Sequence, residues 1–192
     1  MDEYKLDDLK IDDLKIDEVI SSKYQTKNWR KKQIWYKNGK SNECEKYQIN
    51  NIEKIKKIKI NKTNDRINIE KLIIDNYKNP IKNNDGYEYT ENFDGKNIIN
   101  NNIYYFNLKF FCDKGGAQTR TLREVYHFIK YQLDYLVKHK KNNIYFINIL
   151  DGDTSFNSMN KFLYLLNKDK YLHINKNVFI NDLYHFQEYI LQ

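Results

Sequence analysis

The sequence predicts an α/β domain whose central mixed sheet is flanked by helices. Three observations support this fold class. The segment 143–150 (NIYFINIL) is a continuous apolar run of strand length, typical of a strand buried on both faces of a sheet. Residues 119–139 place apolar side chains at helical spacing, which predicts an amphipathic helix just before that strand. Two further strand-like segments lie within 87–111 and predict a hairpin before the helix.

Length and charge divide the chain into three expected parts. With 192 residues, 40% of them hydrophobic, the chain is long enough for one domain with a substantial core. Residues 1–20 carry eight acidic and three basic groups, whereas 23–66 carry 14 basic and four acidic groups. We expect an acidic low-complexity leader (1–22), a basic, mostly helical region (23–80) and an α/β core (81–192) that forms one compact domain with 23–80.

The basic region has two interpretations. A positive segment of this density is suited to contacts with nucleic-acid phosphates, and Lys31 and Lys32 are its candidate DNA-binding residues. However, the abundance of Asn, Lys, Ile and Tyr is typical of an AT-rich genome, which spreads lysines over any protein surface. The leader is equally ambiguous, because its five-residue repeat suits a short amphipathic helix or a partly ordered acidic segment.

The N-terminal elements are expected to be helical. Isoleucines at 49, 52, 55 and 58 recur at helical spacing with lysines largely on the other side. Residues 69–79 (IEKLIIDNYKN) predict a second helix, ended by Pro80, and 83–86 (NNDG) predict a turn.

The second half predicts the order β-β-α-β-α-β-α. Its elements are a strand over 87–95 that ends around Asp94, a turn at 100–102, a strand over 103–111, a helix capped by Thr119 or Thr121 that ends near His139, the strand 143–150, a helix over 158–168, a short strand at 178–182 and a closing helix over 183–192.

Acidic and basic side chains near the end of the predicted hairpin suggest metal-dependent chemistry. Asp94 would end one strand, and Asn107 and Lys109 share a face of the next because residues two apart on a strand point the same way. A carboxylate that holds Mg²⁺, beside a lysine that orients water, is suited to phosphodiester hydrolysis.

These residues resemble the PD-(D/E)xK nuclease superfamily. Phe-Asp-Gly (93–95) corresponds to its acidic motif, and Asn-Leu-Lys (107–109) lies where Glu-x-Lys or Asp-x-Lys is usual. Asn107 departs from the pattern, because an amide is a weaker metal ligand than a carboxylate. Some members carry the missing glutamate on the following helix, where this chain has Glu124. The resemblance implies a restriction-endonuclease-like core, Asp94 and Glu124 (or Asn107) as ligands of Mg²⁺, and Lys109 beside the attacking water.

A more detailed likeness is to restriction enzymes that cut at GATC. Over roughly 90–190 the chain has, in order, NLKFF, the glycine turn GGAQTR (115–120), Leu-Arg-Glu (122–124), NILDG (148–152) and Asn-Asp-Leu (181–183). Near the glycine turn, the side chains of Gln118, Thr119, Arg120 and Arg123 are candidates for contacts with DNA phosphates or base edges.

Each candidate also has a simpler interpretation. Asp94 suits a turn, Lys109 suits a solvated sheet face, and Glu124 suits a local ion pair or the helix dipole. Asp151-Gly-Asp153 suits a tight turn as well as a second acidic site. Three functional alternatives thus stand. The first is a restriction-type endonuclease that cuts double-stranded DNA, with a homodimer favoured by palindromic sites, and the second is an inactive DNA-binding or interaction module on the same fold. The third is a structural protein whose lysines only reflect composition.

Several other classes find no support in the sequence. It contains no phosphate-binding loop, nucleophile elbow or dinucleotide fingerprint. No segment has the length and apolar character of a membrane span or the pattern of a signal peptide, and we expect no membrane partner. Two lone cysteines do not suit a zinc cluster, so we expect an intracellular, reduced protein.

Overall fold

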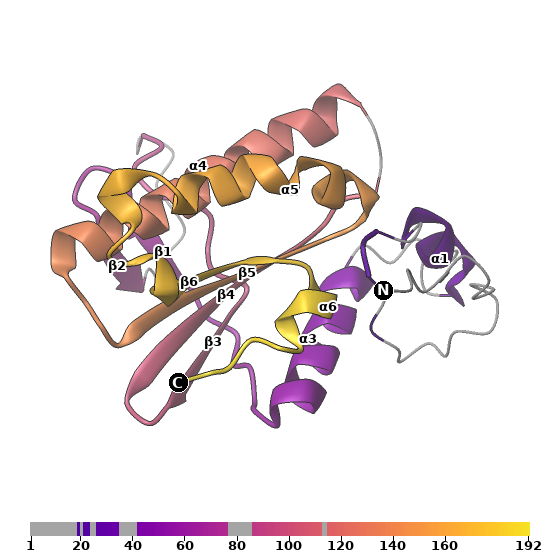
Figure 1. The fold of residues 1–192 in the computed structure, drawn as a ribbon, viewed down its shortest axis with the longest axis horizontal. Helices are drawn as coiled ribbons and strands as arrows, with labels where there is room; N and C mark the ends of the chain where they lie inside the picture. The colour runs from indigo at the N-terminus through magenta and orange to yellow at the C-terminus, as the bar shows by residue number, and fades with distance from the viewer. Residues whose placement is uncertain (1–18, 20, 24–25, 35–41, 77–85, 113–114) are drawn as a thin grey trace, which may run out of the picture.

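A four-stranded mixed sheet lies at the centre of the molecule (Figure 1). The computed structural model describes residues 19, 21–23, 26–34, 42–76, 86–112 and 115–192, so most of the expected leader lies outside it. The strand order is β3-β4-β5-β6. Strand β3 (Gly95–Ile99) is antiparallel to β4 (Asn102–Phe110), whereas β5 (Ile144–Asp151) and β6 (Val178–Asn181) run parallel to β4. The predicted α/β class with a mixed sheet is confirmed.

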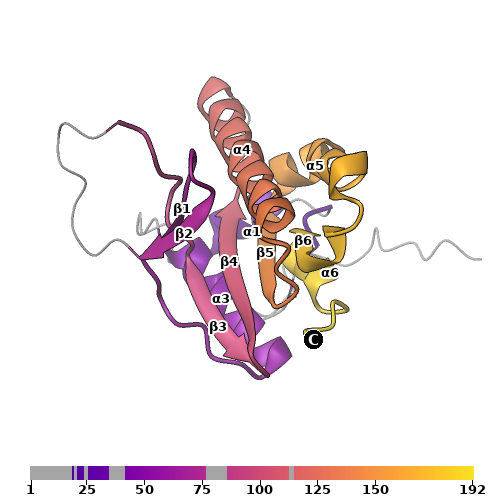
Figure 2. The ribbon, with the colours of Figure 1, turned by 90° about the vertical axis from the view of Figure 1, so that its left-hand side faces the viewer.

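Helices cover both faces of this sheet. Helices α4 (Gly116–His139) and α5 (Asp153–Leu166) lie on one face, and α3 (Glu43–Lys56) and α6 (Leu183–Phe186) lie on the other (Figures 1 and 2). Each face has its own apolar core. All eight residues of β5 are buried, as expected for a central strand covered on both sides.

The first strand of the hairpin differs from the prediction. It begins after Asp94 and runs over Gly95–Ile99, whereas 87–95 was expected. The turn accounts for the far end of the strand, because Asn100 and Asn101 both have positive φ (49° and 67°), as a tight two-residue hairpin turn requires, and Ile99 pairs with Asn102. The pairing runs back to Gly95 opposite Phe106, and beyond it the Leu108 amide bonds to the Asp94 side chain.

The helix expected over 69–79 is wrong for the residues described. Strand β1 (Asp65–Asn68) pairs antiparallel with β2 (Ile73–Asn76) to form a separate two-stranded sheet. Asn68 Oδ1 accepts hydrogen bonds from the amides of Glu70 and Lys71, and this side-chain turn competes with a helix. Residues 77–79, Pro80 and most of the turn expected at 83–86 lie outside the described residues.

Within the described residues, the helices of the basic region lie in its first part. It contains α1 (Thr26–Lys32) and α3 before the β1–β2 hairpin. Lys57 takes a left-handed conformation (φ 53°) and ends α3, so Ile58 lies beyond the helix while Ile52 is fully buried on it.

The remaining elements keep their predicted order, with shifted ends. Helix α4 ends at His139 as expected but begins at Gly116, so Thr119 and Thr121 are not its caps; their hydroxyls donate to Gly115 O and Ala117 O. Helix α5 begins at Asp153, five residues before the expected start. Two 3₁₀ turns (Asp169–Tyr171 and Asn175–Asn177) precede β6. The presence of β6 confirms the short last strand that the sequence predicted.

The closing helix is shorter than predicted. Asp182 caps α6, which covers only Leu183–Phe186. Lys56 Nζ on α3 then donates hydrogen bonds to the carbonyls of Gln187 and Tyr189, which holds this segment in turns against the sheet face. Among the helices of the described residues, none is long and apolar enough to cross a membrane.

Candidate functional site

A lysine lies between two carboxylates near the end of β4. Lys109 Nζ is 3.0 Å from Glu91 Oε2 and 3.6 Å from Asp94 Oδ2. We call Glu91, Asp94 and Lys109 the Lys109 cluster. The fold thus brings Asp94 and Lys109 side by side, as the sequence predicted, and adds Glu91. The side chains of Asp94 and Lys109 are 18% and 17% exposed and that of Glu91 is 46% exposed, so the cluster borders solvent.

The backbone of the hairpin fixes the Asp94 carboxylate. Asp94 N donates to Phe106 O at 2.8 Å, and the Leu108 amide donates to Asp94 Oδ2 at 2.6 Å. The side chain therefore continues the hydrogen-bond ladder one step beyond β3. Glycine at position 95 allows the backbone to pass close to Ile60, since a Cβ there would lie 2.2 Å from Ile60 Cγ2. The Phe-Asp-Gly sequence thus sets both the start of β3 and the orientation of its acid.

Opposing effects set the protonation of the cluster. Burial raises the pKa of Asp94, although Lys109 and the Leu108 amide act in the other direction. Burial would lower the pKa of Lys109, but the charges of Asp94 and Glu91 outweigh it and the pKa is raised. Lys109 is therefore a protonated cation at neutral pH. With both carboxylates ionised, the cluster carries one net negative charge.

Asn107 is not part of the cluster. It is 1% exposed, and its Nδ2 donates to Asn148 Oδ1 at 2.9 Å on β5. Asn148 exchanges two further hydrogen bonds with Gln132 of α4, at 2.8 and 3.0 Å. In the part of the chain that the structure describes, Asn107 Oδ1 has no hydrogen-bond partner. The amide at the motif position thus belongs to a polar network inside the core.

Glu124 does not contact the Lys109 cluster among the described residues. It is exposed on α4, one helical turn before Phe128, whose ring lies 5.0 Å from that of Phe93. Among the described residues, no hydrogen bond or ion pair joins Glu124 to Asp94 or Lys109. The carboxylate that meets Lys109 in addition to Asp94 is Glu91.

Three of the four candidate DNA-binding residues on α4 line one groove. This groove lies between α4 and α5, has a volume of about 330 Å³ and includes Gln118, Thr119 and Arg123. Arg120 is exposed on the same helix and does not line it.

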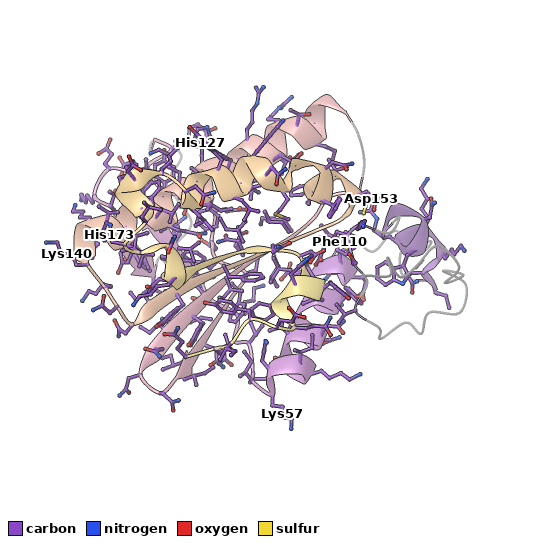
Figure 3. All side chains as sticks on the ribbon, in the orientation of Figure 1. Lys57, Phe110, His127, Lys140, Asp153 and His173 are labelled. Atoms are coloured by element: carbon purple, nitrogen blue, oxygen red, sulfur yellow. The ribbon has the colours of Figure 1, made fainter. Side chains whose placement is uncertain are left out.

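Helix α1, which carries the other two candidates, is anchored at the end of β4. The ring of Trp29 stacks on that of Phe110 with centroids 6.2 Å apart, and the Arg30 guanidinium lies 5.9 Å from the same ring. Figure 3 shows Phe110 at this end of the sheet, beside α1, and His127 on the outer side of α4. Lys31 and Lys32 are exposed on α1. Of the basic side chains of α1, Arg30 thus lies near Phe110, the residue that follows Lys109.

In the second acidic candidate, Asp151 is buried and Asp153 is half-buried. Asp151 is 2% exposed and accepts hydrogen bonds from Leu183 N (2.9 Å) and Gln48 Nε2 (2.6 Å). Burial raises its pKa to about 7, against these hydrogen bonds and with a further contribution from Asp182. Asp182 accepts from the amides of Ser22 and His185, each at 3.0 Å. Asp151 and Asp182 thus lie where the ends of β5 and β6 meet the segment around Ser22.

The Lys109 cluster has the donor chemistry that Mg²⁺ prefers. Mg²⁺ is held through oxygen ligands, commonly one or two carboxylates completed by water and substrate phosphates. Glu91 and Asp94 supply two such carboxylates with a net negative charge, and Glu45 lies near enough to raise the pKa of Asp94 further. No group of three or more His, Cys, Asp or Glu side chains suited to a metal ion occurs in the described residues. Glu91 and Asp94 would therefore need oxygens of water or of a substrate to complete a site for one ion.

Two features of the site were missed from sequence. Glu91 precedes Asp94 by three residues, and this spacing was the available signal, but a regular strand over 87–95 would point the two side chains in opposite directions. Asp151 accepts from Gln48 Nε2, and the Gly152 amide donates to Ser22 Oγ. Each bond joins positions more than 100 residues apart, so the sequence carries no local signal for it.

Comparisons with protein-family models, with curated proteins and with solved structures found no match to this chain.

Proposed function

We propose that this protein is a Mg²⁺-dependent endonuclease of restriction type that hydrolyses phosphodiester bonds in double-stranded DNA. The observation that carries the proposal is the Lys109 cluster, in which a protonated lysine contacts two carboxylates at the end of a β hairpin that borders solvent. Placing an acid before one hairpin strand and a lysine on the next agrees with the PD-(D/E)xK resemblance. The helices on both faces of a mixed sheet are compatible with a core of that type.

The chemistry assigns a different task to each residue. Glu91 and Asp94 would hold the metal ion, which when bound lowers the pKa of water and neutralises phosphate charge. Because the pKa of Lys109 is raised, its ammonium acts as a cation that orients water and stabilises the charge of the transition state, and not as a general base. Lys31 and Lys32 of α1 would contact phosphates beside the cluster.

Cleavage of supercoiled plasmid DNA in Mg²⁺ tests this proposal. We expect nicked or linear product from the wild type, and at least about 100-fold slower cleavage by Asp94→Ala and Lys109→Ala, because each removes a charge from the reacting centre. Lys141→Ala is a matched control, since this exposed lysine precedes β5 at the other end of the sheet. If the protein cuts neither methylated nor unmethylated plasmid, the proposal is contradicted.

A second candidate is a DNA-binding module without catalysis on the same fold. The observation in its favour is that Asn107 faces Asn148 in the core and Glu124 makes no contact with Lys109 among the described residues, which leaves two carboxylates at the cluster. This candidate predicts no cleavage but DNA binding that weakens steeply with salt. Under either candidate, sedimentation with a palindromic duplex tests for a homodimer.

A further inference from the structure

The α4–α5 groove carries uncompensated positive charge. Its lining residues are Gly115, Gln118, Thr119, Leu122, Arg123, Tyr126, Thr154, Ser158, Lys161 and Phe162. None of them is acidic, and two, Arg123 and Lys161, are cations. In the described part of the chain, neither cation forms an ion pair. The groove is therefore suited to an anionic ligand.

The groove also offers an apolar wall. Leu122 and Tyr126 come from α4, and Phe162 comes from α5 with 2% exposure. The rings of Tyr126 and Phe162 lie 6.3 Å apart. A flat aromatic ligand group gains by burying its face on such a surface, whereas inorganic phosphate does not. Around this wall, the side chains of Gln118, Thr119 and Ser158 supply hydrogen-bonding groups.

The groove opens at the same end of the sheet as the Lys109 cluster. Thr154, one of its lining residues, donates its amide to Phe111 O at 3.0 Å, and Phe111 follows Lys109 by two positions. The volume of about 330 Å³ lies at the lower end of the range for small-molecule sites. The groove is therefore sized for a ligand of a few ring systems.

We infer that the α4–α5 groove binds a nucleoside phosphate, with its phosphate between Arg123 and Lys161 and its base against Leu122 and Tyr126. The ligand is either a free nucleotide or one nucleotide of a nucleic-acid strand. The second source rests on the proposed function, since a strand that reaches the Lys109 cluster would pass this groove. The base contact distinguishes this site from the phosphate contacts expected of α1.

Titration calorimetry in EDTA, with no divalent ion, tests the inference. The probes are deoxyadenosine monophosphate, deoxyadenosine, inorganic phosphate and a single-stranded ten-nucleotide DNA. We expect the monophosphate to bind more tightly than the nucleoside or phosphate alone. Arg123→Ala and Lys161→Ala should each raise its Kd about ten-fold or more. Lys138→Ala, at an exposed position in the last turn of α4 and away from the groove, is the matched control and should leave the Kd within about two-fold of the wild-type value.

A second variant tests the groove without changing its charge. Ser158→Trp fills the space between the helices and should abolish monophosphate binding, while thermal unfolding reports whether the fold is intact. Tighter binding of the ten-nucleotide DNA than of the monophosphate identifies a strand as the source, and equal binding identifies a free nucleotide. Unchanged monophosphate binding in both alanine variants would overturn the inference, as would equal affinity for inorganic phosphate.

The outcome is separable from that of the cleavage assay. If the protein binds the monophosphate through Arg123 and Lys161 but does not cut plasmid, the nucleotide site is supported and the proposed function is contradicted. If it cuts plasmid but does not bind the monophosphate, the proposed function is supported and the nucleotide site is contradicted.

Discussion

Asn107 donates a hydrogen bond to Asn148 Oδ1 at 2.9 Å across the two central strands. Asn107 holds the position where the PD-(D/E)xK resemblance implies an acidic ligand, and its side chain therefore lies in the core. Lys109, two residues later, points to the same face of β4. The two side chains differ in their partners. Asn107 lies in a hydrogen-bond network with Asn148 and Gln132. Lys109 lies near the end of the sheet, where it contacts Glu91 and Asp94.

Restoring a carboxylate at position 107 is expected to destabilise the fold. Asn107→Asp would place a negative charge against Asn148 Oδ1 at a site that is 1% exposed, and no cation lies in this network among the described residues. We expect a loss of about 2–4 kcal/mol in the free energy of unfolding, measured by urea denaturation. Asn160→Asp, exposed on α5, is the control. Normal stability and faster cleavage in the Asn107→Asp variant would show that the position does take part in metal binding.

The two candidate carboxylates can be separated by a matched pair of variants. Glu91→Gln removes the charge 3.0 Å from Lys109 Nζ, and we expect it to slow plasmid cleavage at least about 30-fold. Glu124→Gln changes a side chain outside the contacts of the cluster, and cleavage should stay within about two-fold of the wild type. The reverse order of effects would assign the second carboxylate to Glu124.

Stability should depend on pH through Asp151. Burial raises its pKa to about 7 in the folded state, from an ordinary value of 3.8. Between these two values the folded protein holds a proton that the unfolded chain has released, so stability falls as pH rises and this decline ends above about pH 7. Asp151→Asn removes this effect and should stabilise the protein at about pH 8 by on the order of 3 kcal/mol, with little change at about pH 4.

Denaturation at both pH values checks this expectation. The Leu183 amide can still donate to the amide oxygen at position 151, whereas Gln48 Nε2 loses this acceptor and keeps its hydrogen bond to Lys109 O. Asp169→Asn, at an exposed position, should show no such difference. Lower stability of the Asp151→Asn variant at the higher pH would mean that the hydrogen bonds to the charged carboxylate outweigh its burial.

Gly152 is expected to tolerate no side chain. Its φ is +102°, and a Cβ there would lie 2.0 Å from Phe111 O. Gly152→Ala should therefore lower the free energy of unfolding by about 3 kcal/mol or more, seen as a large fall in Tm. Gly116→Ala provides the contrast, because nothing lies within 4 Å of its added Cβ and the position is helical. Equal melting temperatures for the two variants would contradict the close approach of Gly152 to the chain after β4.

Much of the sheet and the pairing of Asp94 with Lys109 could be predicted from local pattern. The run over 144–150 is apolar at every position except Asn148, and α4 repeats apolar residues along most of its length, so each element was recognisable from its own residues. The weaker segments were not. Residues 69–76 carry helical spacing, yet Asn68 turns the chain and the isoleucines are equally suited to strands.

The sequence by itself determined which residues form the central strands and the long helix, because burial on one or both faces imposes a period that is visible along the chain. It also indicated that an acid and a lysine belong to one hairpin, although the structure places Asp94 just before β3 and not at the end of a strand. Only the tertiary structure decided which side chains meet there. Glu91 reaches Lys109 because the chain before β3 is not a regular strand, and Asn107 turns toward Asn148 because a distant strand and helix supply its partner. Such contacts depend on how separate elements pack together, and the residue pattern within one element does not predict that packing.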